Sequence, residues 1–193
     1  VKDVFPGIED YWFTSYRDAV KTSTVIEFIN FCEPLNSYFH CRCYPIDIDK
    51  FVVIFEDVTE QTNISEKIKN SEIIFRYILD GIVITNAKCL IIYTNPAFTN
   101  ITGYTAAEAL GKNPKIVKSG VHSLDFYKTN FWKKLTELGQ WQGDLINRKK
   151  TGELYHQRTT INVIRNSNND IIYYISVFSD ITIIKQAEKQ IFE

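Results

Sequence analysis

Asn147 is the polar side chain of this sequence that is best placed to recognise a small molecule. It lies in a strand predicted over about 141–149, where the alternation of side chains places it on the same face as Trp141 and Leu145. A buried amide needs hydrogen-bond partners. A bound ligand, a backbone carbonyl or a trapped water would each provide them, and the pattern leaves these alternatives open.

The other reactive side chains form no catalytic or metal-binding set. The sequence shows no Ser-His-Asp order, no paired catalytic carboxylates and no glycine-rich phosphate loop. The spacing of its four cysteines matches no zinc pattern, so we expect reduced, packed cysteines of a cytoplasmic protein. A redox or metal role for Cys41 and Cys43, two apart in an apparent strand, is the alternative. We therefore expect no enzyme activity and no metal site.

Charge and hydropathy exclude several classes of partner. The formal net charge of the 193 residues is -1, which gives no electrostatic case for nucleic acid or an anionic membrane. No apolar run approaches the ~20 residues that a membrane-spanning helix needs. We expect no nucleic-acid partner and no membrane contact from this fragment.

The elements around Asn147 predict an α+β fold. Two apolar runs, 82–85 and 90–93, read as a hairpin. Asn95 suits a helix N-cap, Thr105 and Glu108 form a capping box, and a longer helix begins near Ser123. Strands follow at about 141–149, 153–165 and 171–179. This order predicts a five-stranded antiparallel sheet with helices on one face, enclosing a cleft.

The last strand ends at a junction that can transmit a change in the sheet. Asp180 or Thr182 can cap a C-terminal helix that starts near Ile183, which couples distortion of the sheet to the orientation of the helix. Asp57 and Thr59 repeat this arrangement earlier in the chain. We predict that these four residues relay a signal.

The chain reads as one and a half copies of a single unit. Residues 55–59 are similar in sequence to residues 178–182, and His40-Cys41-Arg42 is similar to His156-Gln157-Arg158. The predicted organisation is a partial first unit at 1–62, a connecting helix at 63–72, a complete domain at 73–184 and the start of a signalling helix at 185–193. We expect the beginning of the first unit to be removed or to lie outside this chain; a naturally small N-terminal cap is the alternative.

The connecting segment has one apolar stripe. Ile64 and Ile68 are four residues apart, and Phe75 continues their line. Such a helix can pair with its twin, so we expect a homodimer through the flanking helices. A solvated connector is the alternative.

The complete domain resembles the PAS domains of bacterial signalling proteins. The resemblance covers about residues 73–184 and rests on Asn95-Pro96-Ala97-Phe98, Ile101-Thr102-Gly103-Tyr104-Thr105, Leu110-Gly111-Lys112-Asn113-Pro114, Lys118-Ser119-Gly120, Trp141-Gln142-Gly143, Asn147-Arg148-Lys149-Lys150, Gly152-Glu153 and Ser179-Asp180-Ile181-Thr182. It implies a non-enzymatic sensory and dimerisation module, whose output leaves through the junction at Asp180. A histidine kinase or a cyclic-di-GMP enzyme would be the usual downstream effector in the parent protein. Residues 1–62 resemble the second half of the same domain.

Within that family the chain is similar to flavin-binding redox sensors. The resemblance implies that Trp132 and Asn147 contact flavin adenine dinucleotide (FAD). Pro114 and Val83 stand where those sensors carry an acidic residue and a hydroxyl, so the polar pocket differs. His122 lies near the axial histidine of haem-binding relatives, but the upstream arginine is missing, and we expect a surface histidine and no haem. The alternatives to a general ligand sensor are an FAD redox sensor and a structural spacer without a ligand.

Overall fold

The computed structural model describes residues 9–47 and 50–192. The chain divides into two compact units, Val1–Ser71 and Glu72–Glu193.

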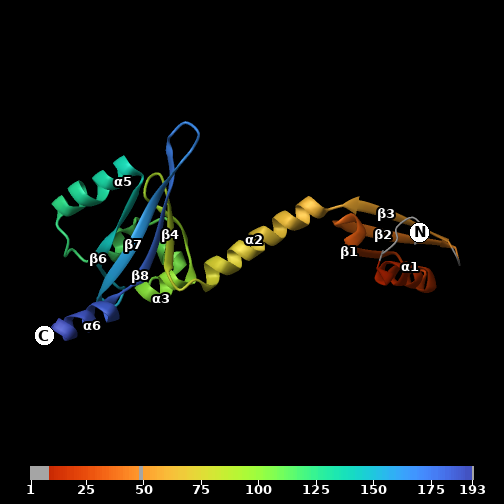
Figure 1. Ribbon diagram of the computed structural model, residues 1–193, viewed down its shortest axis with the longest axis horizontal. Coiled ribbons are helices and arrows are strands. Elements are labelled where there is room, and N and C mark those ends of the chain that lie inside the picture. Colours follow the sequence, from red (N-terminus) through yellow and green to blue (C-terminus); the bar gives the residue numbers. More distant parts are fainter. Residues whose placement is uncertain (1–8, 48–49, 193) are drawn as a thin grey trace. The chain divides into compact units, whose positions relative to one another are not determined.

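A five-stranded antiparallel sheet forms the centre of the second unit (Figure 1). Its strands run in the order β5-β4-β8-β7-β6. The strands are β4 (Gly81–Asn86), β5 (Ile91–Thr94), β6 (Gln140–Arg148), β7 (Leu154–Arg165) and β8 (Ile171–Asp180). The α+β fold predicted from the order of the elements is confirmed.

The predicted caps set the bounds of the short helices. Asn95 caps α3 (Pro96–Thr102), because its Oδ1 accepts a 3.1 Å hydrogen bond from the amide of Phe98. Thr105 and Glu108 form the capping box of α4 (Ala106–Ala109). The 3₁₀-helix η2 (Pro114–Val117) follows. The helix α6 (Thr182–Phe192) ends the described chain.

The predicted long helix is not regular. Ser123 does accept a hydrogen bond from the amide of Phe126, as an initiating residue would, but the next seven residues form the π-helix η3 (Phe126–Trp132). The regular helix α5 spans only Lys133–Leu138. Aromatic rings are in mutual contact along this segment and on to Trp141. The wider π turn gives these rings room. The regular spacing of apolar residues in the sequence does not indicate a π-helix.

The core of the second unit lies between the sheet and the helices. One buried cluster joins β4, β5 and β8 to α3 and α4, and its members are Val83, Ile91, Phe98, Ala109 and Phe178. The other joins β6 to the π-helix and α5 through Phe131, Leu135, Trp141 and Leu145. The two clusters fix the ends of the sheet, and the cavity described below lies between them.

The described residues of the first unit form a three-stranded antiparallel sheet that contacts the helix α1. The elements are α1 (Asp10–Thr22), β1 (Ile26–Cys32), η1 (Glu33–Leu35), β2 (Ser37–Asp47) and β3 (Lys50–Asp57), with strand order β1-β2-β3. Trp12 on α1, Cys32 on β1 and Cys41 on β2 form the buried core of this unit. Phe55 on β3 is 61% exposed, since no further strand among the described residues covers that edge.

The connecting helix is longer than predicted. The sequence pattern places it at 63–72, whereas α2 spans Thr59–Tyr77. It begins at Thr59, whose amide donates a hydrogen bond to Asp57. No glycine or proline interrupts the following residues, so the helix continues into the segment that was assigned to the PAS domain.

Candidate ligand-binding site

A cavity of about 430 Å³ lies inside the second unit, between the sheet and the helices. This volume is within the range of small-molecule sites. Every strand of the sheet contributes to its wall, together with α3, η2 and the π-helix. Most of the lining is apolar, and its largest apolar members include Ile91, Phe98, Phe131, Leu135, Leu145 and Phe178.

Asn147 and Gln157 form the polar end of the cavity. Both side chains are buried and both line it. Asn147 Nδ2 donates a 2.9 Å hydrogen bond to Gln157 Oε1, and the hydroxyl of Tyr155 donates to the same oxygen at 2.8 Å. Burial raises the pKa of Tyr155, which keeps its hydroxyl protonated as a donor. The side-chain partner of Asn147 is thus an amide, which none of the three predicted alternatives named.

This network leaves an acceptor oxygen on one side chain and the N–H donors of the other available. Among the described residues, Asn147 Oδ1 and Gln157 Nε2 have no hydrogen-bond partner. In the same residues, Thr94 Oγ1 is the only side-chain polar atom that is both fully buried and without a hydrogen-bond partner. Asn147 Oδ1 and Gln157 Nε2 therefore remain accessible from the cavity. A ligand in the cavity can therefore meet an acceptor and a donor on neighbouring side chains.

Trp132 lies on the wall of the same cavity. It ends the π-helix, is 37% exposed, and meets Tyr174 of β8 edge-on with 6.2 Å between ring centroids. The two residues predicted to contact a cofactor, Trp132 and Asn147, thus line one site. Contact of either with a flavin stays a prediction.

His122 is not the surface histidine that the sequence suggested. Its ring is half-buried and stacks on Phe126 at 4.7 Å. The amide of Ile146 donates a 2.8 Å hydrogen bond to Nε2, so this lone pair is already in use. Burial also lowers the pKa of His122, which favours the neutral ring. The residue fastens the loop before the π-helix to β6.

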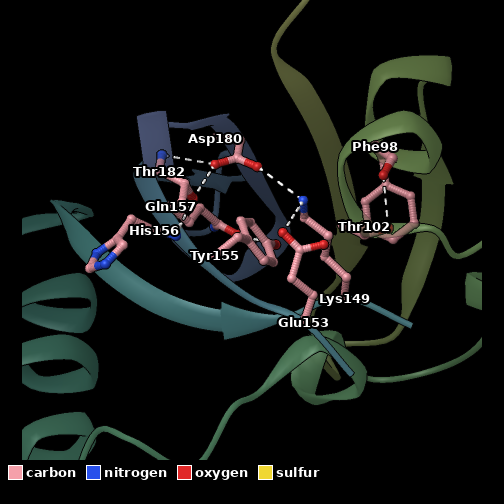
Figure 2. A network of polar contacts seen from close by, with 9 residues as sticks. All are labelled: Phe98, Thr102, Lys149, Glu153, Tyr155, His156, Gln157, Asp180 and Thr182. Atoms are coloured by element: carbon pink, nitrogen blue, oxygen red, sulfur yellow. Dashed lines mark hydrogen bonds and ion pairs between the residues drawn. The ribbon is translucent and has the colours of Figure 1, made fainter. Parts of the chain in front are cut away.

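The junction between β8 and α6 is held by Asp180 and Thr182 (Figure 2). Asp180 Oδ1 accepts from the amide of Thr182 at 2.9 Å and from its hydroxyl at 2.5 Å. The hydroxyl of Thr182 in turn accepts a 2.9 Å hydrogen bond from the amide of His156, on β7. The amide of Ile181 donates to the carbonyl of His156 at 2.8 Å. The start of α6 is therefore attached to β7 at the residue before Gln157.

Lys149 adds an ion pair to this junction. Its Nζ is 3.5 Å from Asp180 Oδ2 and 3.2 Å from Glu153 Oε1, as Figure 2 shows. Burial alone would raise the pKa of Asp180. The hydrogen bonds from Thr182 and the charge of Lys149 outweigh burial, so the pKa of Asp180 is below its ordinary value. The carboxylate is ionised at neutral pH.

The first unit contains the same junction. Asp57 Oδ1 accepts from the amide of Thr59 at 3.0 Å and from its hydroxyl at 2.6 Å. Thr59 Oγ1 accepts from the amide of Tyr38 at 2.8 Å, and the amide of Val58 donates to the carbonyl of Tyr38 at 2.9 Å. Tyr38 thus takes the place of His156.

The strand register corrects the internal alignment. Asp57 pairs with Phe39, and Asp180 pairs with Gln157. Phe39 therefore corresponds to Gln157, and the match of His40 to His156 is wrong by two residues. Both segments contain a His-x-Arg pattern, and because the loops between the strands differ in length, this pattern does not mark equivalent positions.

Gln157 is the site residue that the sequence reasoning missed. The signal was available, since Tyr155, Gln157 and Thr159 alternate along β7 and share one face. All three are buried. His156, which lies between Tyr155 and Gln157, is on the opposite face of the strand.

The cysteines of the first unit are packed, as predicted. Cys32, Cys41 and Cys43 are buried and all four cysteines are free thiols. Burial raises the pKa of Cys41 to about 11. Across residues 9–47 and 50–192, no group of three or more His, Cys, Asp or Glu side chains is placed to hold a metal ion. In the same ranges, no helix is both long and apolar enough to cross a bilayer.

The PAS domain family model matches residues 79–182, which is more than half of the chain. The chain belongs to the PAS domain family. The order of the sheet, the short helices and the cavity between them lie within the matched segment. The second unit is a PAS sensory domain, and its role belongs to signal transduction.

Two curated relatives carry signalling names. The chain is 32% identical over 111 residues to the nitrogen fixation regulatory protein of Klebsiella oxytoca, covering 58% of this chain and 22% of that protein. It is 31% identical over 94 residues to the blue-light-activated histidine kinase of Brucella canis, covering 48% of this chain and 19% of that protein. The chain therefore spans about a fifth of the length of these relatives.

A solved PAS domain of a protein from Colwellia psychrerythraea shares the fold. Its TM-score is 0.54 at 20% identity, and the match covers 60% of this chain and 98% of that one.

Proposed function

We propose that the second unit senses a small molecule in its cavity and relays occupancy to α6, without catalysing a reaction itself. One observation carries the proposal. Asn147 contacts Gln157 at the cavity wall, and the neighbouring residue of Gln157 on β7 holds the first residue of α6. Rearrangement of the amide pair on ligand binding would move β7 and with it the start of α6.

Replacement of Asp180 by alanine tests the relay. Because Asp180 joins Thr182 and Lys149, its loss should release the start of α6 while leaving the cavity unchanged. In the full parent protein, the output should no longer follow the signal, although binding persists. Loss of binding in Asp180→Ala would contradict the assignment of this residue to the relay.

The effector of the parent protein is proposed to be a histidine kinase or a cyclic-di-GMP enzyme, in the cytoplasm. The name of the Brucella relative, a histidine kinase, supports the first of these.

Pairing of two chains through the flanking helices is also proposed. Ile64 and Ile68 on α2 and Ile184 and Ile191 on α6 are exposed, at spacings that suit a helical seam. Analytical ultracentrifugation of the chain and of an Ile64→Ser, Ile68→Ser variant tests the pairing.

An FAD-dependent redox sensor is the second candidate. The available acceptor on Asn147 and donor on Gln157 suit the edge of a flavin ring, and Trp132 offers an aromatic wall. Undenatured protein should then absorb at about 450 nm, the region of flavin absorption. Asn147→Ala should release the flavin or shift its spectrum; an unchanged flavin content and spectrum would contradict the assignment of Asn147 to the flavin site.

The open cavity disfavours the third alternative, a spacer whose cleft is filled by its own side chains.

The first unit is proposed to be the C-terminal part of a second PAS domain. Its junction at Asp57 repeats the junction at Asp180 in four hydrogen bonds, and each buries an aliphatic residue, Val58 or Ile181. Asp57→Ala should therefore loosen the start of α2 as Asp180→Ala loosens α6. Hydrogen exchange at the amides of Thr59 and Thr182 compares the two.

A further inference from the structure

The charges around the cavity are all of one sign. Lys115, Lys118 and Lys128 line it, and no aspartate or glutamate among the described residues does. The chain as a whole is balanced, with 22 Lys and Arg against 23 Asp and Glu. A lining of three cations and no anion is therefore a local feature of the site and not a reflection of a basic protein.

These three lysines are also without acidic partners. Within the described part of the chain, none of them has a carboxylate within ion-pair distance, whereas Lys149, Lys150 and Lys185 are all paired. Lys118 Nζ lies 4.4 Å from the centre of the Tyr127 ring, at the same wall as Lys128. Lys115 and Lys118 belong to one turn, because the amide of Lys118 donates to the carbonyl of Lys115. The positive charge is thus concentrated at η2 and the π-helix.

The remainder of the lining has a different character. Apolar side chains from the sheet, α3 and α5 form the body of the cavity, and the amides of Asn147 and Gln157 form its polar end on β6 and β7. A ligand that satisfies all three regions has an apolar body, a hydrogen-bonding group and a negative charge.

We propose that the cavity selects organic anions, with a carboxylate, phosphate or sulfonate held by Lys115, Lys118 and Lys128 and an apolar body held between the sheet and the helices. The inference rests on the proposed sensory function and names the class of its ligand. The charge contributes selectivity, because three cations attract an anion and do not attract a neutral molecule of the same shape.

A matched pair of fluorescent probes tests the class. 8-Anilino-1-naphthalenesulfonate is an anion, and N-phenyl-1-naphthylamine is its neutral counterpart without the sulfonate. We expect the anion to bind the whole chain more tightly than the neutral probe at low salt, and high salt to reduce this difference. In a K115Q/K118Q/K128Q variant, the affinity for the anion should fall about tenfold while the neutral probe binds as before. This is the combined effect of the two exposed lysines, Lys115 and Lys128, and the half-buried Lys118.

Two further variants locate the effect. K88Q/K133Q/K134Q removes the same charge from lysines that do not line the cavity, and it should leave both affinities unchanged. Ser176→Leu places a larger side chain on the cavity wall and should weaken both probes if they bind there. Circular dichroism checks that each variant is folded.

The possible outcomes separate this inference from the proposed function. Equal affinity of the wild type for both probes, or an equal loss in the two lysine triples, would overturn the selection of anions and leave a cavity that binds ligands. Binding that Ser176→Leu does not alter would place the probes elsewhere and overturn the inference as well. Failure of both probes to bind would count against the cavity as a ligand site, and so against the proposed function itself.

Discussion

The side-chain amide of Asn147 on β6 donates a 2.9 Å hydrogen bond to the side-chain carbonyl of Gln157 on β7. Gln157 lies directly opposite Asp180 in the strand register, and the preceding residue binds Thr182. The polar end of the cavity and the first turn of α6 are therefore separated by one residue of one strand. This proximity is the physical basis of the proposed relay.

Removal of Gln157 should cost more stability than removal of Asn147. Gln157→Leu leaves two buried donors, Asn147 Nδ2 and the hydroxyl of Tyr155, without their acceptor, and we expect a loss of about 2 kcal/mol. Asn147→Leu should cost less, because Gln157 keeps the bond from Tyr155. Urea unfolding measures both, with Gln142→Leu on the exposed face of β6 as the control. An equal cost for Gln157→Leu and Gln142→Leu would show that the network does not stabilise the domain.

Gly81 has no room for a side chain. A Cβ at this position would lie 2.3 Å from the ring of Phe178, so Gly81→Ala should destabilise the second unit by about 2 kcal/mol. Phe178→Leu removes the obstructing ring atoms. In a double-mutant cycle, the loss of stability in the double variant should be about 1 kcal/mol smaller than the sum of the losses in the two single variants. Additive effects would mean that the backbone adjusts and the contact is not restrictive.

The capping box should give the domain a specific dependence on acid. The bond from Lys150 Nζ and those from Thr105 lower the pKa of Glu108 to about 2. A carboxylate whose pKa is lower in the folded state than in the unfolded state stabilises the folded state at pH values above the unfolded pKa. This contribution is lost as the pH falls toward the pKa of the folded state.

The comparison of the wild type with Glu108→Gln measures that dependence. The difference in urea midpoint should be constant above about pH 5 and shrink between about pH 4.5 and 2. A difference that stays constant down to pH 2 would show that the ionised form of Glu108 contributes nothing.

Thiol reactivity should separate Cys89 from the other cysteines. Cys32, Cys41 and Cys43 are buried, whereas Cys89 is only half-buried beside the cavity. Burial raises the pKa of Cys41, Cys43 and Cys89 alike, so accessibility to the reagent distinguishes Cys89. Titration of the native protein with Ellman's reagent should label at most one thiol rapidly, and urea should expose all four. Rapid labelling of two or more native thiols would contradict the packed core of the first unit.

Local sequence signals predicted the parts of the fold that depend on neighbouring residues. Asn95, Thr105 and Glu108 act within one turn of their own position, so the N-terminal caps and the starts of α3 and α4 could be predicted directly. The alternation along 141–149 placed Asn147 correctly on the cavity side of β6.

Contacts between distant segments could not be read in this way. The bond between Asn147 and Gln157 depends on the register of two strands, and the bond from Ile146 to His122 depends on how a loop returns to β6. The π-helix follows from tertiary packing of its aromatic rings and not from their spacing. The same limitation produced the shifted alignment of His40 with His156.

Hydrogen exchange at the amides of Ile181 and Thr182, with and without saturating 8-anilino-1-naphthalenesulfonate, tests the link between cavity and helix most directly. Filling the cavity should change exchange at these two amides, because both are held through His156 or Asp180, and should leave the amides of α1 in the first unit unchanged. Identical exchange at Ile181 and Thr182 with the cavity saturated would contradict the relay.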